Sequence, residues 1–282
     1  MDEDTATQVD VAGDPAEVDA GAAEKAVAPV REYARHGLAP NDYGRLFQDL
    51  AKSGLRPVWF DGYRVAGKVF YNVVWRPAES SWRAFRGLDS PTYNARVNAA
   101  IADGYSPTHV ESYLNAAGGV RYAVILVRDG ERDLIARHGL TAAEHQDVFA
   151  AAVERGLSPV AVSVVSLGGQ LRYTVLYRAV DVGRWELRSR IRVEDFQEVF
   201  DDMRRDGLLP SYIAAYQHER RTFFSVIFTQ RGGAGRLIRH GLDSAAYQQV
   251  WEEQLADGAS TRVVTGYEQP SGRHRFAAVW IR

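Results

Sequence analysis

The chain lacks cysteine entirely among its 282 residues. That absence excludes disulfide bonds, thiolate nucleophiles and sulfur-rich zinc sites, although it does not indicate a cellular compartment. No apolar run approaches the roughly 18 residues that a membrane-spanning helix requires, so no membrane partner is expected. Lysine is scarce as well, with only Lys25, Lys52 and Lys68 present. None of these lysines has a serine at the spacing of a Ser-x-x-Lys catalytic pair.

Acidic residues are concentrated in residues 1–28, which carry eight of them against Lys25 and contain no aromatic residue. A segment this acidic and this poor in apolar periodicity is predicted to be disordered. It has neither the positive leader nor the apolar core of a secretory signal, so we expect a cytoplasmic protein or one secreted from a longer precursor. Residues 29–282 carry an excess of about five positive charges. This excess is too small and too dispersed to indicate a nucleic-acid partner.

The most informative feature that is present is a repeat. The tetrapeptide Arg-His-Gly-Leu occurs three times, ending at Leu38, Leu140 and Leu242, with successive copies 102 residues apart. Degenerate copies that end at Leu88 and Ile191 lie midway between them, and a glycine follows each of the five anchors by 16 positions. One supersecondary unit is therefore used five times. The predicted architecture is a single domain over 29–282 with units at about 29–78, 79–129, 130–179, 180–230 and 231–282.

Each unit is predicted to be a helix followed by a β-hairpin, which makes the chain an α+β repeat protein. Asp89, Thr141 and Asp243 are the expected N-caps, and Thr141 with Glu144 has the spacing of a capping box. The glycine that follows each anchor is expected to end the helix in a left-handed conformation. Alternating apolar residues on both sides of a glycine-containing turn then predict the two strands of the hairpin.

The units are expected to pack against one another. The second strand of each hairpin is apolar on both faces, as in residues 70–75 and 121–126, so its own helix should cover one face and a neighbouring unit the other. The pattern is compatible with an open arc and with a closed, five-bladed, propeller-like ring. The end of the sequence directly after a strand favours the ring, because an open terminal repeat usually needs a polar cap.

The repeated tetrapeptide provides the first set of candidate ligand-binding residues: His36, His138 and His240, with Arg86 and Ser189 at the equivalent positions. The favoured interpretation is geometric, with glycine making a turn, leucine filling the core, and the flanking Arg and His satisfying carbonyl groups near a strand-to-helix corner. The alternative places the five side chains on a ligand surface or at a metal. No His-x-x-x-His pair supports a metal, so none is expected.

A tyrosine column provides the second set of candidates. Tyr63, Tyr113, Tyr216 and Tyr267 stand six residues after the proline position of their units, where the third unit has Val165. Tyrosines repeated about an axis can form a stacking or hydrogen-bonding floor for a peptide or sugar. They can equally be core residues that hold the repeats together, and this second interpretation is favoured.

No catalytic motif is found. A Gly-x-Ser-x-Gly elbow is absent, and a cysteine-histidine dyad is impossible without cysteine. The glycine-rich stretch at 232–235 lacks the Lys-Ser/Thr ending of a phosphate loop and falls between two units, where a linker is expected. Paired carboxylates at 201–202 and 252–253 occupy helix positions where neighbours point apart. No cofactor is therefore expected.

Two strings carry a family resemblance: Ala-Arg-His-Gly-Leu-Thr-Ala-Ala at 136–143 and Gly-Arg-His-Arg-Phe-Ala-Ala-Val-Trp at 272–280. They resemble the two ends of the bacterial tandem repeat domain, over about residues 30 to 282. This repeat accompanies β-lactamase-like serine hydrolases, including the N-terminal domain of fungal polyglycine hydrolases, and also occurs without an obvious catalytic domain. The resemblance implies a binding or positioning role, with a separate hydrolase as a possible partner. It transfers no catalytic residue, because the Ser-x-x-Lys domain is missing. Pentein propellers are also similar in having five α/β units, but their amidine-modifying members use a catalytic cysteine.

Two functions follow from these patterns. The favoured one is a non-catalytic scaffold that binds a peptide, a glycan or a small natural product in an aromatic-rich concavity or central channel. The alternative is an enzyme of unassigned chemistry, in which His, Arg and Tyr side chains from several repeats meet in a central pocket. An enzyme should show one asymmetric polar cluster, whereas a scaffold lining should stay nearly symmetric. The fourth unit diverges most, at 188–192 and 217–221, and is the expected place for such a cluster.

Overall fold

The computed structural model describes residues 31–231, 237–269 and 271–282. The predicted disordered segment at 1–28 and the predicted linker at 232–235 lie outside these described residues. Within the described ranges, no helix is both long enough and apolar enough to cross a lipid bilayer.

All five units share one order of elements: strand, helix, strand, strand. The first unit contains β1 (Tyr33–Leu38), α1 (Pro40–Lys52), β2 (Leu55–Val65) and β3 (Lys68–Pro77). The second contains β4 (Trp82–Leu88), α2 (Ser90–Ala102), β5 (Ser106–Leu114) and β6 (Val120–Val127), and the third β7 (Leu134–Leu140), α3 (Ala142–Glu154), β8 (Ser158–Leu167) and β9 (Gln170–Arg178). The fourth contains β10 (Trp185–Arg192), a 3₁₀ turn (Val193–Asp195), α4 (Phe196–Arg205), β11 (Leu209–His218) and β12 (Arg221–Thr229), and the fifth β13 (Leu237–Leu242), α5 (Ser244–Ala256), β14 (Ser260–Glu268) and β15 (His274–Ile281).

The predicted hairpin is present in every unit, but the unit also has a strand that the sequence analysis missed. Each three-stranded sheet has the order first, third, second, as in β1-β3-β2, so the last strand lies in the middle. The missed strand contains the repeated tetrapeptide itself. Its pairing with the middle strand is interrupted by a register shift, between Arg35 and Leu38 in the first unit. Gly37 lies inside this bulge with φ +65°, a conformation that L-residues other than glycine rarely adopt.

The predicted helix signals are confirmed. The Asp89 side chain accepts from Thr92 N and the Asp243 side chain from Ala246 N, while Thr141 and Glu144 form a complete capping box. The glycines that follow the helices all have positive φ, namely Gly54, Gly104, Gly156, Gly207 and Gly258. These caps satisfy backbone N–H and C=O groups that would otherwise have no hydrogen-bond partner at the helix ends.

Each helix lies between two sheets. In α1, the rings of Tyr43 and Phe47 contact Tyr71 and Trp75 in the sheet of the same unit, at 5.4 and 5.0 Å between centroids. Phe47 also contacts Trp82 in the next unit, at 5.9 Å. The middle strand is buried on both faces, as predicted, since the successive residues Val73, Val74 and Trp75 of β3 are 0% exposed. One unit cannot bury its apolar residues without the next, so the repeats stabilise one another.

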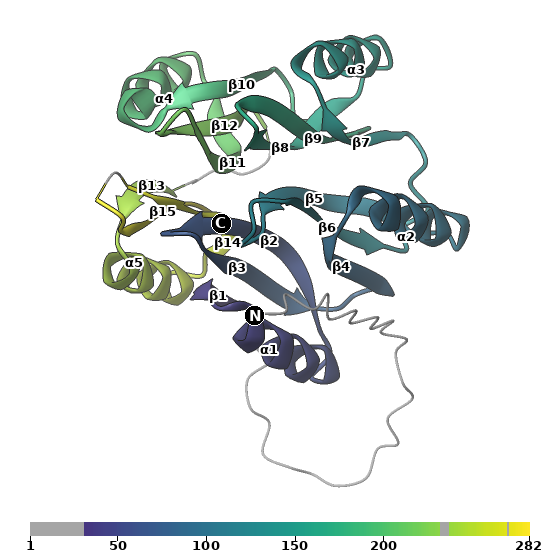
Figure 1. Cartoon of the computed structure of the whole chain (residues 1–282), viewed down its shortest axis with the longest axis horizontal. Helices are drawn as coiled ribbons and strands as arrows, with labels where there is room; N and C mark the ends of the chain where they lie inside the picture. Colours follow the sequence, from purple (N-terminus) through teal and green to yellow (C-terminus); the bar gives the residue numbers. More distant parts are fainter. Residues whose placement is uncertain (1–30, 232–236, 270) are drawn as a thin grey trace, which may run out of the picture.

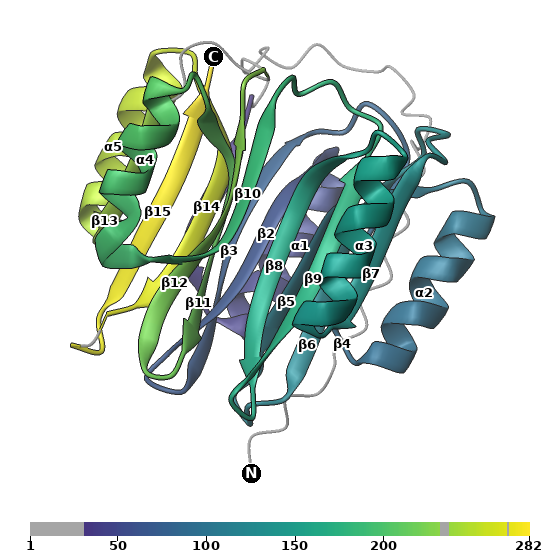
Figure 2. The same cartoon turned by 90° about the horizontal axis from the view of Figure 1, so that it is seen from above.

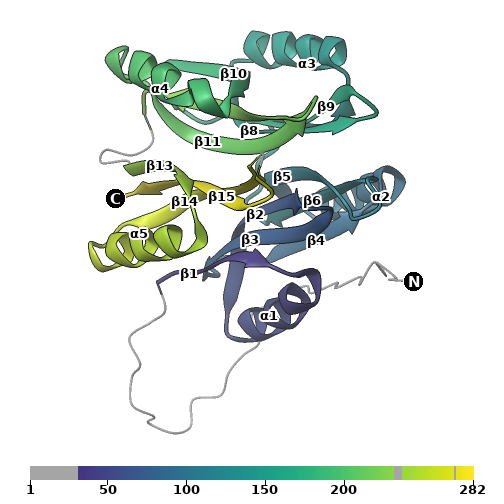
Figure 3. The same cartoon turned by 60° about the vertical axis from the view of Figure 1, so that its left-hand side comes forward.

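The second strand of each unit is the first strand of its hairpin, namely β2, β5, β8, β11 and β14. These second strands lie toward the middle of the molecule and the helices lie outside (Figures 1 and 3). Viewed from above, these strands run in a similar direction (Figure 2). Strand β2 contacts β5, β5 contacts β8, β8 contacts β11, β11 contacts β14, and β14 contacts β2. Each of them is an edge strand of its own sheet. The side chains that meet in the middle must therefore satisfy their free backbone groups.

The anchor residue of the tetrapeptide is less uniformly buried than predicted. Leu88 and Ile191 are buried, whereas Leu38, Leu140 and Leu242 are only half-buried. The expectation that the anchor fills the core in every copy is therefore wrong for these three. Their side chains still pack against core residues at the edge of the sheet.

Candidate functional site

A cavity of about 230 Å³ lies where the five second strands end. Every unit contributes to its wall, through residues 62–64, 112–114, 164–166, 215–217 and 266–268, together with Gly67. We call it the axial cavity. It is lined mostly by small and aromatic residues, with polar side chains near the hairpin turns, as is usual for sites that bind small ligands.

The tyrosine column lines this cavity and also holds the units together. Tyr63, Tyr113, Tyr216 and Tyr267 are all among the lining residues, yet each is at most 6% exposed. The Tyr113 ring lies so close to Gly62 of the preceding unit that a Cβ there would be 2.6 Å from it. A Cβ at Gly266 of the fifth unit would be 2.4 Å from the Tyr63 ring. These rings are interfaces between units as well as cavity walls.

The hydroxyl groups of the column are already engaged. Tyr216 donates to Ser189 O at 2.7 Å, and Tyr267 Oη accepts from Gly241 N at 3.1 Å. Tyr63 Oη lies 3.1 Å from His274 Nδ1, and Tyr113 Oη lies 3.4 Å from Tyr71 Oη. Burial raises the pKa of Tyr63, Tyr216 and Tyr267. The cavity therefore offers tyrosine ring edges rather than free or ionised phenols.

The histidine column lies elsewhere, between neighbouring units. The His138 ring lies 4.5 Å from both Tyr93 and Tyr122 of the preceding unit, and its Nε2 is 2.9 Å from Ser90 Oγ. His36 and His240 make the same kind of contact. His36 lies 4.6 Å from Tyr247 and 4.9 Å from Phe276, with Ser244 Oγ at 2.7 Å, and His240 lies 5.1 Å from Phe196, with Gln197 Oε1 at 3.2 Å. The structure does not bring the three together.

Arg86 and Ser189 complete the column in two different ways. Arg86 lies over the Tyr43 and Tyr71 rings of the first unit, at 4.6 and 5.1 Å, as a cation–π contact. Ser189 of the fourth unit has no ring to pack on the preceding unit. In that preceding unit, the third, His145 of α3 stacks on Tyr173 instead, with ring centroids 4.6 Å apart. Four members of the column, His36, Arg86, His138 and His240, thus make contacts between units.

The expected carbonyl contacts belong to the arginines alone. Arg35 donates to Ala34 O at 2.9 Å and Arg137 to Ala136 O at 2.8 Å. The three histidines bond hydroxyl or amide side chains instead. The prediction was therefore wrong for histidine, because the ring extends past the corner to the preceding unit.

Because His36 is largely buried, the stability of the protein should depend on pH through this residue, which provides a first prediction. Desolvation, aided by Arg35, lowers the pKa of His36 from 6.5 to about 4. Below pH 6.5 His36 is therefore protonated in the unfolded chain but stays neutral in the folded chain. The free energy of unfolding falls as the pH drops toward 4. We expect His36→Gln to lose less stability than the wild type over this window in urea unfolding. Above pH 7.5 the difference between the two proteins should be constant, and a constant difference down to pH 4 would contradict the assignment.

A column of buried polar groups that the sequence analysis missed lies beside the axial cavity. It stands two residues before the tyrosine column and consists of Asp61, Glu111, Ser163, Ala214 and Thr265. Its polar side chains accept hydrogen bonds from free backbone N–H groups on the second strands of neighbouring units. Asp61 accepts from Gly266 N at 2.9 Å, Ser163 Oγ from Ser112 N at 3.0 Å, and Thr265 Oγ1 from Ala215 N at 3.0 Å. Strand alternation places this column on the face of the buried tyrosines, which is the signal that could have identified it.

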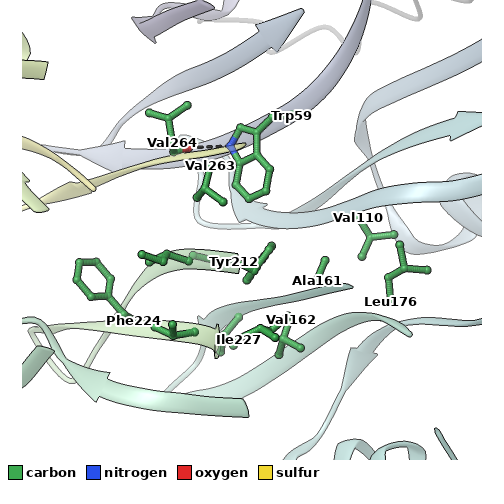
Figure 4. Close-up of a cluster of buried hydrophobic side chains, with 14 of the residues drawn as sticks. Trp59, Val110, Ala161, Val162, Leu176, Tyr212, Phe224, Ile227, Val263 and Val264 are labelled. Atoms are coloured by element: carbon green, nitrogen blue, oxygen red, sulfur yellow. Dashed lines mark hydrogen bonds between the residues drawn. The ribbon is translucent and has the colours of Figure 1, made fainter. Parts of the chain in front are cut away.

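A second missed column satisfies carbonyl groups in the same way. Trp59 Nε1 donates to Val264 O at 2.7 Å, the contact drawn in Figure 4. His109 Nε2 lies 2.6 Å from Phe60 O and therefore carries the proton. Burial lowers the pKa of His109 to about 4, so the ring is neutral near pH 7. The Trp59 ring also lies 5.5 Å from Tyr212 of the fourth unit, and Figure 4 shows Val162 beside Ile227 in the same apolar cluster.

Asp61 and Glu111 are the acidic members of the missed column. Asp61 accepts three hydrogen bonds, from Gly266 N, Thr265 Oγ1 and Asn72 Nδ2 at 2.8 to 2.9 Å. Burial nevertheless raises its pKa to about 7, and burial and the nearby charge of Asp61 raise the pKa of Glu111 well above its usual range. Neither carboxyl is part of the cavity wall. This buried acidic pair lies in the first two units, whereas the sequence analysis directed the search for an asymmetric polar cluster to the fourth unit.

The rim of the axial cavity carries two charged residues, Arg64 and Glu268. Both Glu268 oxygens accept hydrogen bonds, Oε1 from Ala66 N at 3.1 Å and Oε2 from Gln217 Nε2 at 3.4 Å. Arg64 makes one long contact, from Nη2 to Ala116 O at 3.5 Å. Within 31–231, 237–269 and 271–282, no group of three His, Asp or Glu residues is placed to hold a metal ion.

Comparison with known families gives one match. The family model described as polyglycine hydrolase-like, structural repeat, matches the chain five times in tandem, at residues 31–78, 79–128, 132–179, 182–231 and 233–282. No curated protein matches the chain.

Proposed function

We propose, since this chain belongs to the polyglycine hydrolase-like structural repeat family, that it is a non-catalytic scaffold which binds a ligand in the axial cavity. The ligand is a peptide, a glycan or a small natural product. The observation that carries the proposal is the convergence of all five units on one cavity. A repeat protein with a single place of convergence has one natural ligand site there, whereas grooves between units exist in several copies.

The chemistry of the wall supports binding over catalysis. The tyrosine hydroxyls are hydrogen bonded, and both oxygens of Glu268 are already acceptors. A general acid or base needs a group that can reach the substrate and exchange a proton at working pH. The residues of the cavity wall offer shape and ring contacts instead. The family name adds that a peptide is the first ligand class to test, and that a separate hydrolase is the partner whose substrate the scaffold would position.

Closure of the five units into a propeller-like ring is part of the same proposal. Strand β14 contacts β2, and the His36 ring packs on Tyr247 and Phe276 of the fifth unit. Glu32 supports this junction, because its carboxylate accepts from Thr261 N at 2.9 Å and from Trp251 Nε1 at 3.3 Å and pairs with Arg76. In a closed ring the first unit holds the cavity-lining residues 266–268 of the fifth unit in place. An open arc would lose that part of the cavity wall.

The enzyme alternative has one observation in its favour. Asp61 and Glu111 form the asymmetric polar cluster that divergence toward catalysis would produce, and their pKa values are raised, as at many active sites. Their burial and their bonds to strand edges support a structural role. Activity that disappears in Glu111→Gln while folding is retained would favour the enzyme.

A cavity-filling substitution tests the binding proposal. Ala215 lines the axial cavity and is half-buried, so a phenylalanine there has room to project into the space that a ligand would occupy. We expect Ala215→Phe to weaken binding of glycine-rich oligopeptides by tenfold or more. Binding is measured from the chemical-shift changes of the Val164, Val165 and Gly266 amides. Ala143→Phe on the exposed side of α3 is the control and should bind as the wild type does. Equal binding by both variants would place the ligand elsewhere.

A further inference from the structure

Arg64 in β2 carries a guanidinium that makes one long hydrogen bond among the described residues, from Nη2 to Ala116 O at 3.5 Å. Its Nε is buried and has no hydrogen-bond partner in the part of the chain that the structure describes, although the residue forms part of the axial cavity wall. The terminal nitrogens, which carry most of the N–H donors of the guanidinium, are the atoms left to bind a ligand. We infer that Arg64 binds a carboxylate of the ligand, and that the axial cavity takes the free C-terminal end of a short peptide. This inference rests on the proposed function.

The two charged residues of the wall differ in how far the fold already uses them, and this difference favours an anionic ligand. Glu268 is the other charged residue in the wall, and its two oxygens are already occupied by Ala66 N and Gln217 Nε2. The guanidinium of Arg64, in contrast, makes only the 3.5 Å contact with Ala116 O among the described residues. The group that remains available is therefore the cation.

The shape of the guanidinium favours a carboxylate over other acceptors. Its two terminal nitrogens form one edge of a planar fork, which matches the two oxygens of a carboxylate and gives two charge-assisted hydrogen bonds. A lysine ammonium cannot reproduce this geometry. The Arg64 side chain also passes close to the turn of the next hairpin, since a Cβ at Gly118 would be 3.8 Å from its Nη1.

The rest of the wall favours a chain end with small side chains. Gly62, Ser112, Ala215 and Gly266 are small and line the cavity, and the rings of Tyr63 and Tyr113 lie directly against the two glycines. An extended peptide end can approach such a surface closely, and its carboxylate then lies at the Arg64 side of the mouth. A large side chain at the last position would meet the tyrosine rings.

The test uses two matched probes, N-acetyl-diglycine and its C-terminal amide, titrated into the full-length protein labelled with ¹⁵N. The probes differ only in the terminal charge. We expect the carboxylate to shift amides of the cavity wall, and the amide to bind roughly tenfold to hundredfold more weakly, because charge-assisted hydrogen bonds are lost. Arg64→Gln should remove the difference between the probes, and Arg64→Lys should keep only part of it.

Arg56 provides the control. It lies in the same strand, its Nε is also buried without a described partner, and it is not among the residues of the cavity wall. Arg56→Gln should bind both probes as the wild type does, and thermal unfolding of each variant checks that it is folded. Equal binding of the two probes, unchanged in Arg64→Gln, would overturn the inference and leave the proposed function intact. Absence of wall shifts with either probe would overturn the inference and would remove peptides from the ligand classes of the proposed function.

Discussion

Gly266→Ala is expected to destabilise the protein by about 3 kcal/mol or more in urea unfolding, although it adds a single methyl group. The new Cβ would lie 2.4 Å from the Tyr63 ring, well inside van der Waals contact. Overpacking a core position typically costs about 1–3 kcal/mol, and more where neighbours cannot move. The expected loss is at the upper end because both partners are fixed.

Tyr63 is fixed at both ends of its side chain. Its hydroxyl lies 3.1 Å from His274 Nδ1, and its ring packs on Phe70 and Phe276 with centroids 5.9 and 6.2 Å apart. Gly266 is fixed by its backbone, because its N–H donates to Asp61 at 2.9 Å. Relief of the clash therefore requires the first and fifth units to separate. That movement breaks hydrogen bonds as well as apolar contacts.

Two further variants separate this clash from a general intolerance of alanine. Gly44 lies within α1, where an added Cβ would meet nothing closer than Arg86 Nη2 at 4.0 Å. Gly44→Ala should stabilise the protein by up to about 1 kcal/mol, through helix propensity. Tyr63→Val, which copies Val165 of the third unit, should make Gly266→Ala much less costly in a double-mutant cycle. Additive losses would show that the ring is not the cause.

The repeat made most of the fold predictable, because spacing is independent of chemistry. A fixed interval between an anchor and a glycine identifies the number of units, and caps such as Thr141 with Glu144 identify where a helix begins. The first strand was missed because its sequence resembles a turn. It is short, contains a glycine with positive φ such as Gly37, and has exposed polar side chains such as Arg35. Only its pairing with the middle strand makes it a strand.

The site was less predictable, because its contacts join different units. The tyrosine column could be read from the sequence, but the partner of each hydroxyl depends on how neighbouring units pack. Asp61 and Glu111 share no chemistry with Ala214 at the same repeat position, so a search for recurring residues passes over them. Arg64 matters because of an absent partner in the described structure. A sequence contains no direct record of unsatisfied donors.

Asp61→Ala is the second change with a large expected effect, a loss of roughly 3 kcal/mol or more at pH 7. Asp61 accepts from Gly266 N and Thr265 Oγ1 of the fifth unit and from Asn72 Nδ2, and Asn72 Oδ1 accepts from Gly37 N. Its removal leaves several buried donors unsatisfied, at about 1–3 kcal/mol for each. Alanine itself is compatible with this position, since the fourth unit has Ala214 there. Asn72→Ala in addition removes one of these donors but also the acceptor of Gly37 N, so the double variant should recover little of the loss.

Asp61→Asn isolates the titration from the shape. Burial raises the pKa of Asp61 to about 7 from its usual 3.8, so the folded wild type takes up a proton between pH 7 and pH 4 that the unfolded chain does not hold. The wild type therefore gains stability relative to Asp61→Asn as the pH falls through this window. The sign is opposite to that of His36, whose lowered pKa costs stability over the same range. The wild type should thus resist mild acid better than Asp61→Asn and less well than His36→Gln. A difference between wild type and Asp61→Asn that does not change between pH 7 and 4 would mean that Asp61 stays ionised, held by its three donors.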